Sequence, residues 1–152
     1  MRPGIFSFLN AVKPLYELVA FSSETKEFSD VILNEIEKNK KFFDFKLYKD
    51  HCTLYKNRFV KDITKLGRDI RKIIVVDDDE NNFVLNKENG IKISPYYGDD
   101  EDNGRLSSNK RKDNALLELK KILIMIYKDN YDDIREALKD YDELIKMKVT
   151  ME

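Results

Sequence analysis

The stretch IIVVDDDENNF, residues 73 to 83, runs from four branched apolar residues directly into three consecutive aspartates. A short apolar run that ends abruptly in polar residues is typical of a buried β-strand. Asp77 and Asp78 therefore lie at the carboxyl end of the expected strand, where sheets of parallel strands bind their ligands. Taken alone, the stretch favours a solvated acidic turn over a binding site. Residues at the ends of other expected strands make a binding site the better interpretation.

Expected helices and strands alternate along the chain on both sides of this stretch. Apolar residues recur at helical spacing in four segments, and short apolar runs indicate strands. Partly alternating aromatic residues and a Lys56-Asn57 turn candidate indicate extended or hairpin structure over residues 42–62. The expected helices span 4–16, 25–39, 114–129 and 132–147, and the expected strands span 17–23, 73–77 and 90–98. This alternation predicts an α/β fold with a doubly wound sheet.

Composition excludes several classes of protein. The chain has 152 residues, of which 41% are hydrophobic, enough for one domain with a core. Its 28 basic and 29 acidic residues nearly cancel, so the net charge gives no argument for binding nucleic acid or an anionic membrane. No stretch reaches the roughly 20 apolar residues of a membrane helix. A single cysteine, Cys52, fits a reducing compartment, and the only histidine, His51, lacks partners for a zinc site.

Two further strand ends carry residues that suit a phosphate group. Ser22 ends the strand 17–23 just before a helix, whose free N–H groups attract anions. Lys61 follows the apolar pair Phe59-Val60 and would balance phosphate charge, while paired aspartates are oxygen ligands of the kind that Mg²⁺ takes. Together these residues indicate phosphoryl chemistry. The alternatives are a helix cap for Ser22 and an ordinary exposed lysine for Lys61.

Five blocks of the sequence resemble one known family. They are RPGIFSFL (2–9), LYELVAFSS (15–23), LYKDHCTLYKNRFVKDITKLGRDI (47–70), IIVVDD (73–78) and NKENGIKISPYYGD (86–99). The order and spacing of HCT, FVKD, LGRD and VDD are specific, and the match resumes at DNALLELKKIL. The chain therefore resembles the NLI-interacting-factor-like, or RNA polymerase II C-terminal-domain, phosphatases of the haloacid dehalogenase superfamily.

The resemblance implies a role for each residue singled out above. Ser22 matches the Ser/Thr that binds phosphate, and Lys61 matches the lysine that stabilises its transferred charge. Asp77 matches the acid that supports this lysine, and Asp78 matches the ligand of a Mg²⁺ cofactor. The implied activity is magnesium-dependent hydrolysis of phosphoserine in a protein or peptide substrate, through an aspartyl-phosphate, on a mostly parallel three-layer sheet with a small β insertion.

The sequence also departs from the family pattern. The family's nucleophile motif, D-x-D-x-[TV], precedes the RPG block on the central strand of the sheet, and no segment of the chain matches it. We therefore expect residues 1–147 to form one phosphatase-like domain that is truncated at its amino terminus and lacks that strand. Residues 99–113 are expected to be a loop insertion, and Glu80 replaces a common proline.

A second function stays open at this point. The same family includes a mitochondrial inner-membrane translocase subunit that uses this fold to bind presequences. A non-catalytic binding module of that kind needs no nucleophile. The resemblance favours an intracellular protein, nuclear or cytoplasmic for the phosphatases and mitochondrial for the translocase branch. The chain itself contains no expected membrane segment.

Overall fold

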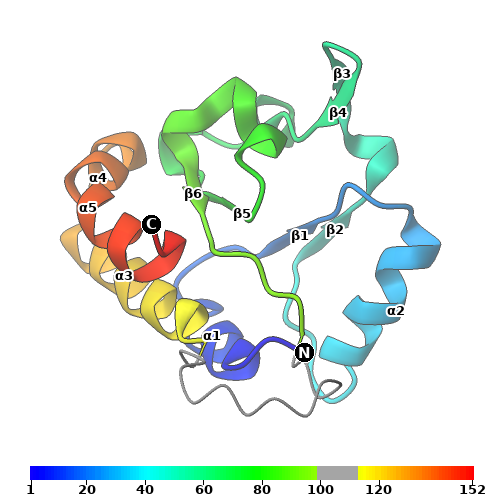
Figure 1. Cartoon of the computed structure of the whole chain (residues 1–152), viewed down its shortest axis with the longest axis horizontal. Coiled ribbons are helices and arrows are strands. Elements are labelled where there is room, and N and C mark those ends of the chain that lie inside the picture. The colour runs from blue at the N-terminus through cyan, green and yellow to red at the C-terminus, as the bar shows by residue number, and fades with distance from the viewer. Residues whose placement is uncertain (99–112) are drawn as a thin grey trace.

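Short strands and helices alternate along most of the chain in the computed structural model, which describes residues 1–98 and 113–152 (Figure 1). The expected insertion at 99–113 therefore lies, except for Asp113, outside the described residues. The strands are β1 (Val19–Phe21), β2 (Phe45–Leu47), β3 (Thr53–Tyr55), β4 (Arg58–Val60), β5 (Val75–Asp77) and β6 (Gly90–Lys92). The helices are α1 (Ile5–Val12), α2 (Lys26–Ile36), α3 (Ala115–Asp129), α4 (Ile134–Asp140) and α5 (Asp142–Ile145), followed by a π-helical turn (Lys146–Thr150).

The strands form three separate pairs in the part of the chain that the structure describes. β1 pairs with β2 in parallel, and β5 pairs with β6 in parallel, whereas β3 and β4 are antiparallel. The mixed α/β class and the parallel pairs agree with the sequence prediction. The continuous, doubly wound sheet of the prediction is not formed by these pairs alone.

The antiparallel pair is the hairpin predicted around Lys56 and Asn57. Both residues have positive φ angles, 48° and 60°, as a two-residue turn of the type favoured in hairpins requires. Asparagine tolerates this left-handed region better than most residues. The hairpin projects from the body of the molecule and leads directly through β4 to Lys61 (Figure 1).

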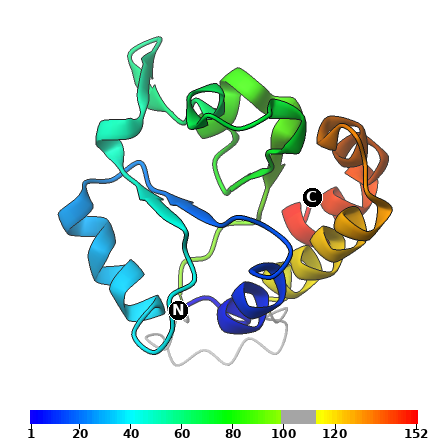
Figure 2. The ribbon, with the colours of Figure 1, turned by 180° about the vertical axis from the view of Figure 1, so that it is seen from behind.

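The core lies around α3, which buries Ala115, Leu116, Leu119, Ile122, Leu123 and Ile126. Leu119 and Ile122 are fully buried and pack with Val12 of α1 and Ile91 of β6. Seen from behind, α1 lies alongside α3 (Figure 2). Tyr16, just after α1, donates a hydrogen bond from its hydroxyl to the Leu123 carbonyl over 2.6 Å, which holds the two helices together. Among helices of residues 1–98 and 113–152, none is both long and apolar enough to cross a membrane.

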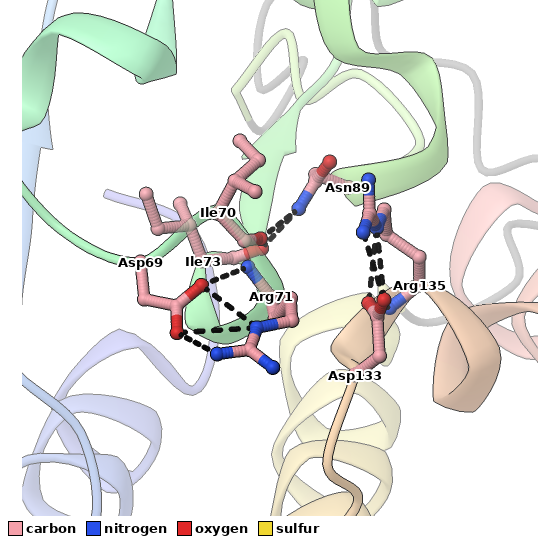
Figure 3. A network of polar contacts seen from close by, with 7 residues as sticks. All are labelled: Asp69, Ile70, Arg71, Ile73, Asn89, Asp133 and Arg135. Atoms are coloured by element: carbon pink, nitrogen blue, oxygen red, sulfur yellow. Dashed lines mark hydrogen bonds and ion pairs between the residues drawn. The ribbon is translucent and has the colours of Figure 1, made fainter.

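A polar network anchors the start of β5. Asn89 is 1% exposed, and its side-chain amide donates to the carbonyls of Ile70 and Ile73, over 2.8 and 3.0 Å (Figure 3). A buried amide of this kind is costly unless it is hydrogen-bonded. The Asn89 bonds therefore fix the chain that enters β5 against the chain that enters β6.

Nearby, Asp133 accepts from the Arg135 backbone N–H and so caps α4.

Gly90, the first residue of β6, touches the Phe83 ring so closely that no side chain fits. A Cβ at this position would lie 2.1 Å from the ring. We expect Gly90→Ala to lower the free energy of unfolding by about 1–3 kcal/mol, because an overpacked core must shift. Urea unfolding measures this loss. Phe83→Leu in the same protein should recover part of it, and strictly additive losses in the double variant would contradict the steric explanation.

Candidate functional site

Lys61 and Asp77 form an ion pair at the carboxyl end of β5. The Lys61 Nζ lies 2.6 Å from Asp77 Oδ2, and the two side chains are only 11% and 7% exposed. Lys61 follows β4 directly, and its backbone N–H donates to the Asn82 carbonyl over 2.8 Å. A charge removed from water this far is tolerated only with its partner in place. The hairpin therefore delivers the lysine, and β5 delivers the carboxylate that holds it.

Asp77 has further donors besides the lysine. The Asp79 backbone N–H donates to Oδ1 over 3.0 Å, and the Asn82 amide lies 3.2 Å from both carboxylate oxygens. A carboxylate offers about four lone-pair sites, so these contacts occupy the Asp77 acceptors. Asp77 is thus held as an orienting anion for Lys61.

Asp79 turns away from this pair. Its carboxylate forms an ion pair with Arg58 of the hairpin, and it accepts from the Asn81 backbone N–H over 3.0 Å. That second contact caps the start of the 3₁₀-helical segment Glu80–Asn89, which non-helical backbone at Phe83 and Asn86 interrupts. The sequence did not predict this segment. Hydrogen bonds to Asn81 and Arg58 lower the pKa of Asp79 despite some burial. The third aspartate of the run therefore has a structural role.

Asp78, between these two, is exposed to solvent. Partial burial of its carboxyl group raises its pKa, and the neighbouring Asp77 raises it further. In residues 1–98 and 113–152, no cluster of three or more acidic, histidine or cysteine side chains is placed to hold a metal ion by itself. Mg²⁺ often binds through only one or two carboxylates, completed by water and phosphate oxygens. Asp78 fits that mode, in which the metal arrives with a phosphate.

Ser22 lies just beyond the end of β1. Its Oγ accepts from the Glu24 backbone N–H over 3.0 Å and from the Ser29 hydroxyl over 2.7 Å, while Thr25 caps α2. The helix-cap alternative for Ser22 is therefore wrong. The preceding residue, Phe21, places its ring centroid 5.8 Å from the Lys61 Nζ, a cation–π distance. The ends of β1 and β5 thus meet around Lys61, although no hydrogen bond joins Ser22 to Lys61 among the described residues.

Cys52 and His51 have structural environments. Burial raises the pKa of the Cys52 thiol, an effect that the nearby Lys61 and Lys49 partly oppose. A thiol with a raised pKa is a poor nucleophile. The His51 Nδ1 accepts from the Tyr48 backbone N–H over 2.9 Å, which fixes the local turn.

Sequence reasoning missed two residues of the site, Asn82 and Arg58. Both bind the aspartate run, and Arg58 also donates to the Asn82 Oδ1 over 3.3 Å. The polar run that continues after the strand, DDDENN, was the only signal for Asn82. It does not reveal which side chain folds back onto Asp77.

Removing the buried carboxylate should cost far more than removing its exposed neighbour. We expect Asp77→Asn to lower the free energy of unfolding by about 3 kcal/mol or more, because Lys61 loses its buried partner. The matched change Asp79→Asn keeps a capping oxygen and breaks only the exposed pair with Arg58, so about 1 kcal/mol or less is expected. Urea unfolding of both variants measures these two losses. Equal losses of unfolding free energy would mean that the Lys61–Asp77 pair is screened by water.

The raised pKa of Asp78 predicts a gain in stability on its removal. A carboxyl group whose pKa is higher in the folded than in the unfolded protein stabilises the folded state only while it is protonated. This contribution to the free energy of unfolding is lost as the pH rises through the raised pKa. Without metal, Asp78→Asn should therefore be more stable than the wild type at neutral pH. The gain should vanish below a pH of about 4, the ordinary pKa of aspartate. Unfolding measured at acid and neutral pH tests this, and a gain independent of pH would contradict it.

Comparison with known proteins agrees with the blocks identified in the sequence. The family model for NLI interacting factor-like phosphatases matches residues 1–135. The mitochondrial import inner membrane translocase subunit TIM50 of Candida glabrata is 31% identical over 140 residues, which is 92% of this chain and 26% of that protein. The human protein of the same name is 30% identical over 140 residues, 92% of this chain and 36% of that protein.

A relative of the other type is the CTD small phosphatase-like protein 2 of Dictyostelium discoideum. It is 27% identical over 146 residues, 96% of this chain and 23% of that protein. The chain thus spans about a quarter to a third of the length of these relatives. The match covers most of the chain, including Ser22, Lys61 and the aspartates. The chain belongs to the NLI interacting factor-like phosphatase family.

Proposed function

We propose that this domain binds the phosphate group of a phosphoserine-containing protein segment, as part of a magnesium-dependent protein phosphatase site. The observation that carries the proposal is the buried Lys61–Asp77 pair at the ends of β1 and β5. An ammonium group has three donors, and Asp77 takes one of them. Among the described residues only Asp77 accepts from this ammonium group, so two donors remain for an anion that approaches the strand ends.

Ser22 would add a neutral hydrogen bond to the same anion. With Ser29 as the donor in their mutual contact, Ser22 keeps its own hydroxyl proton for a ligand. The Glu24 N–H holds its oxygen in place. A prepositioned donor of this kind loses little freedom when it binds, so it supports both affinity and charge stabilisation.

Mg²⁺ would be held by Asp78 together with phosphate oxygens and water. When bound, the metal supplies positive charge that neutralises the phosphate. Asp77 does not compete for it, because Lys61, Asn82 and the Asp79 N–H occupy its oxygens. The attacking carboxylate that the family resemblance implies belongs to a D-x-D-x-[TV] motif, which residues 1–152 do not contain. The described side chains therefore support the proposal of phosphate binding, and we assign no nucleophile among them.

A second candidate is a binding module without catalysis, of the kind found in a translocase subunit. Two relatives at 31% identity carry that name, and the chain has no nucleophile motif of its own. Such a module would bind a protein segment regardless of phosphorylation. Dependence on phosphate therefore separates the two candidates.

The test is binding of one serine peptide in phosphorylated and unphosphorylated form, with and without Mg²⁺. We expect the phosphorylated form to bind more tightly, by about tenfold or more, since charge-assisted hydrogen bonds are worth about 1.5–3 kcal/mol. Lys61→Ala should abolish this preference. Lys65→Ala is the matched control, because Lys65 lies nearby but its Nζ binds Thr53 Oγ1 over 2.9 Å.

Calorimetry or fluorescence anisotropy gives the affinities. Equal affinity for both peptides in the wild type would refute phosphate recognition and favour the binding module. An equal loss in the Lys61 and Lys65 variants would mean that general positive charge, and not the buried pair, attracts the peptide.

A further inference from the structure

Asn82 contacts both ends of the residue on which the proposed site depends. Its backbone carbonyl accepts from the Lys61 N–H over 2.8 Å. Its side-chain amide lies 3.2 Å from both oxygens of Asp77, the counter-ion of the Lys61 ammonium group. One asparagine thus fixes the backbone of the lysine and, through Asp77, the direction of its side chain.

The opposite side of the Asn82 amide is also occupied. Its Oδ1 accepts from Arg58 over 3.3 Å, and the same guanidinium pairs with Asp79. This contact orients the amide so that its N–H groups face Asp77. The order Arg58, Asn82, Asp77, Lys61 is therefore a chain of donors and acceptors from the exposed hairpin to the buried ammonium group.

We propose that Asn82 is a positioning residue, which aims the Lys61 ammonium group at the phosphate-binding end of β1 by saturating Asp77. The inference rests on the proposed function in taking phosphate as the ligand. The contacts of Asn82 with Lys61 and Asp77 do not depend on that function. Without the amide, Asp77 could rotate or take up water, since two of its acceptor sites would be free. Lys61 would then lose its fixed direction toward the Phe21 ring.

The sharpest variant is Asn82→Asp, which keeps the size of the side chain and the acceptor for Arg58. It replaces a donor to Asp77 with a second carboxylate, so the contact becomes repulsive. Asn81→Asp adds the same charge one residue earlier, at an exposed position, and is the matched control. Asn82→Ala removes the donor without adding charge, in case the repulsion prevents folding.

Two measurements are made on each protein. The first is the Nζ signal of Lys61 in ¹⁵N-lysine-labelled protein, which reports whether the ammonium group is held. The second is the affinity for inorganic phosphate. We expect both Asn82 variants to lose the held Lys61 signal and to bind phosphate about tenfold to hundredfold more weakly. The control should stay within about twofold of the wild type.

An unchanged Lys61 signal in both Asn82 variants would overturn the inference. If the wild type binds no phosphate at all, the proposed function fails, and the Lys61 signal still decides the role of Asn82.

The exchange variant Asp77→Asn with Asn82→Asp separates the positioning of Lys61 from the stability of the fold. It restores a hydrogen bond between the two positions but moves the counter-ion, so we expect recovered folding stability without recovered phosphate affinity. Recovery of both would mean that any bond at this place suffices.

Discussion

The buried pair between Lys61 and Asp77 is the interaction on which the rest of this site depends. A lysine 11% exposed and a carboxylate 7% exposed can lie at the edge of a core only in contact with each other. The pair joins two parts of the chain that share no sheet, the hairpin pair β3–β4 and the parallel pair β5–β6. Through the Phe21 ring it also reaches the end of β1. The site is thus the place where three separate strand pairs meet.

The strand pairs explain why this meeting point is not closed by a sheet. In parallel pairing, alternate residues direct their backbone groups to each side of a strand. The Ser22 N–H donates to the Leu47 carbonyl of β2, and the Asp77 carbonyl accepts from the Ile93 N–H just after β6. The backbone groups of the preceding residues, Phe21 and Val76, therefore point away from β2 and β6. Val76 is 38% exposed, unusual for the centre of a parallel strand. Among the described strands, β1 and β5 therefore each have one unpaired edge.

Local chemistry was sufficient to predict most elements of the fold. The Lys56-Asn57 turn and the apolar run before Asp77 depend on near neighbours in the chain, and both appear where expected. The 3₁₀-helical segment Glu80–Asn89 was not predicted, because its apolar residues, Phe83 to Leu85, are consecutive and show no helical spacing. Lys61 pairs with Asp77, and Asp78 is the next residue along the chain. Ser22 is related to Lys61 only through its neighbour Phe21, whose ring lies near the Lys61 ammonium group. Asn82 could not be predicted, because its role comes from contacts between strands that are distant in sequence.

Two adjacent carboxylates in this site have opposite environments, and this difference limits the chemistry that each can perform. Asp77 is buried, paired and saturated with donors, so it cannot attack a phosphate without releasing Lys61. Asp78 is exposed, and partial burial of its carboxyl group together with the neighbouring Asp77 raises its pKa. Neither is therefore suited to be a nucleophile. The proposed phosphate binding does not depend on which group attacks phosphorus, and relatives of this chain are named both as a phosphatase-like protein and as a translocase subunit.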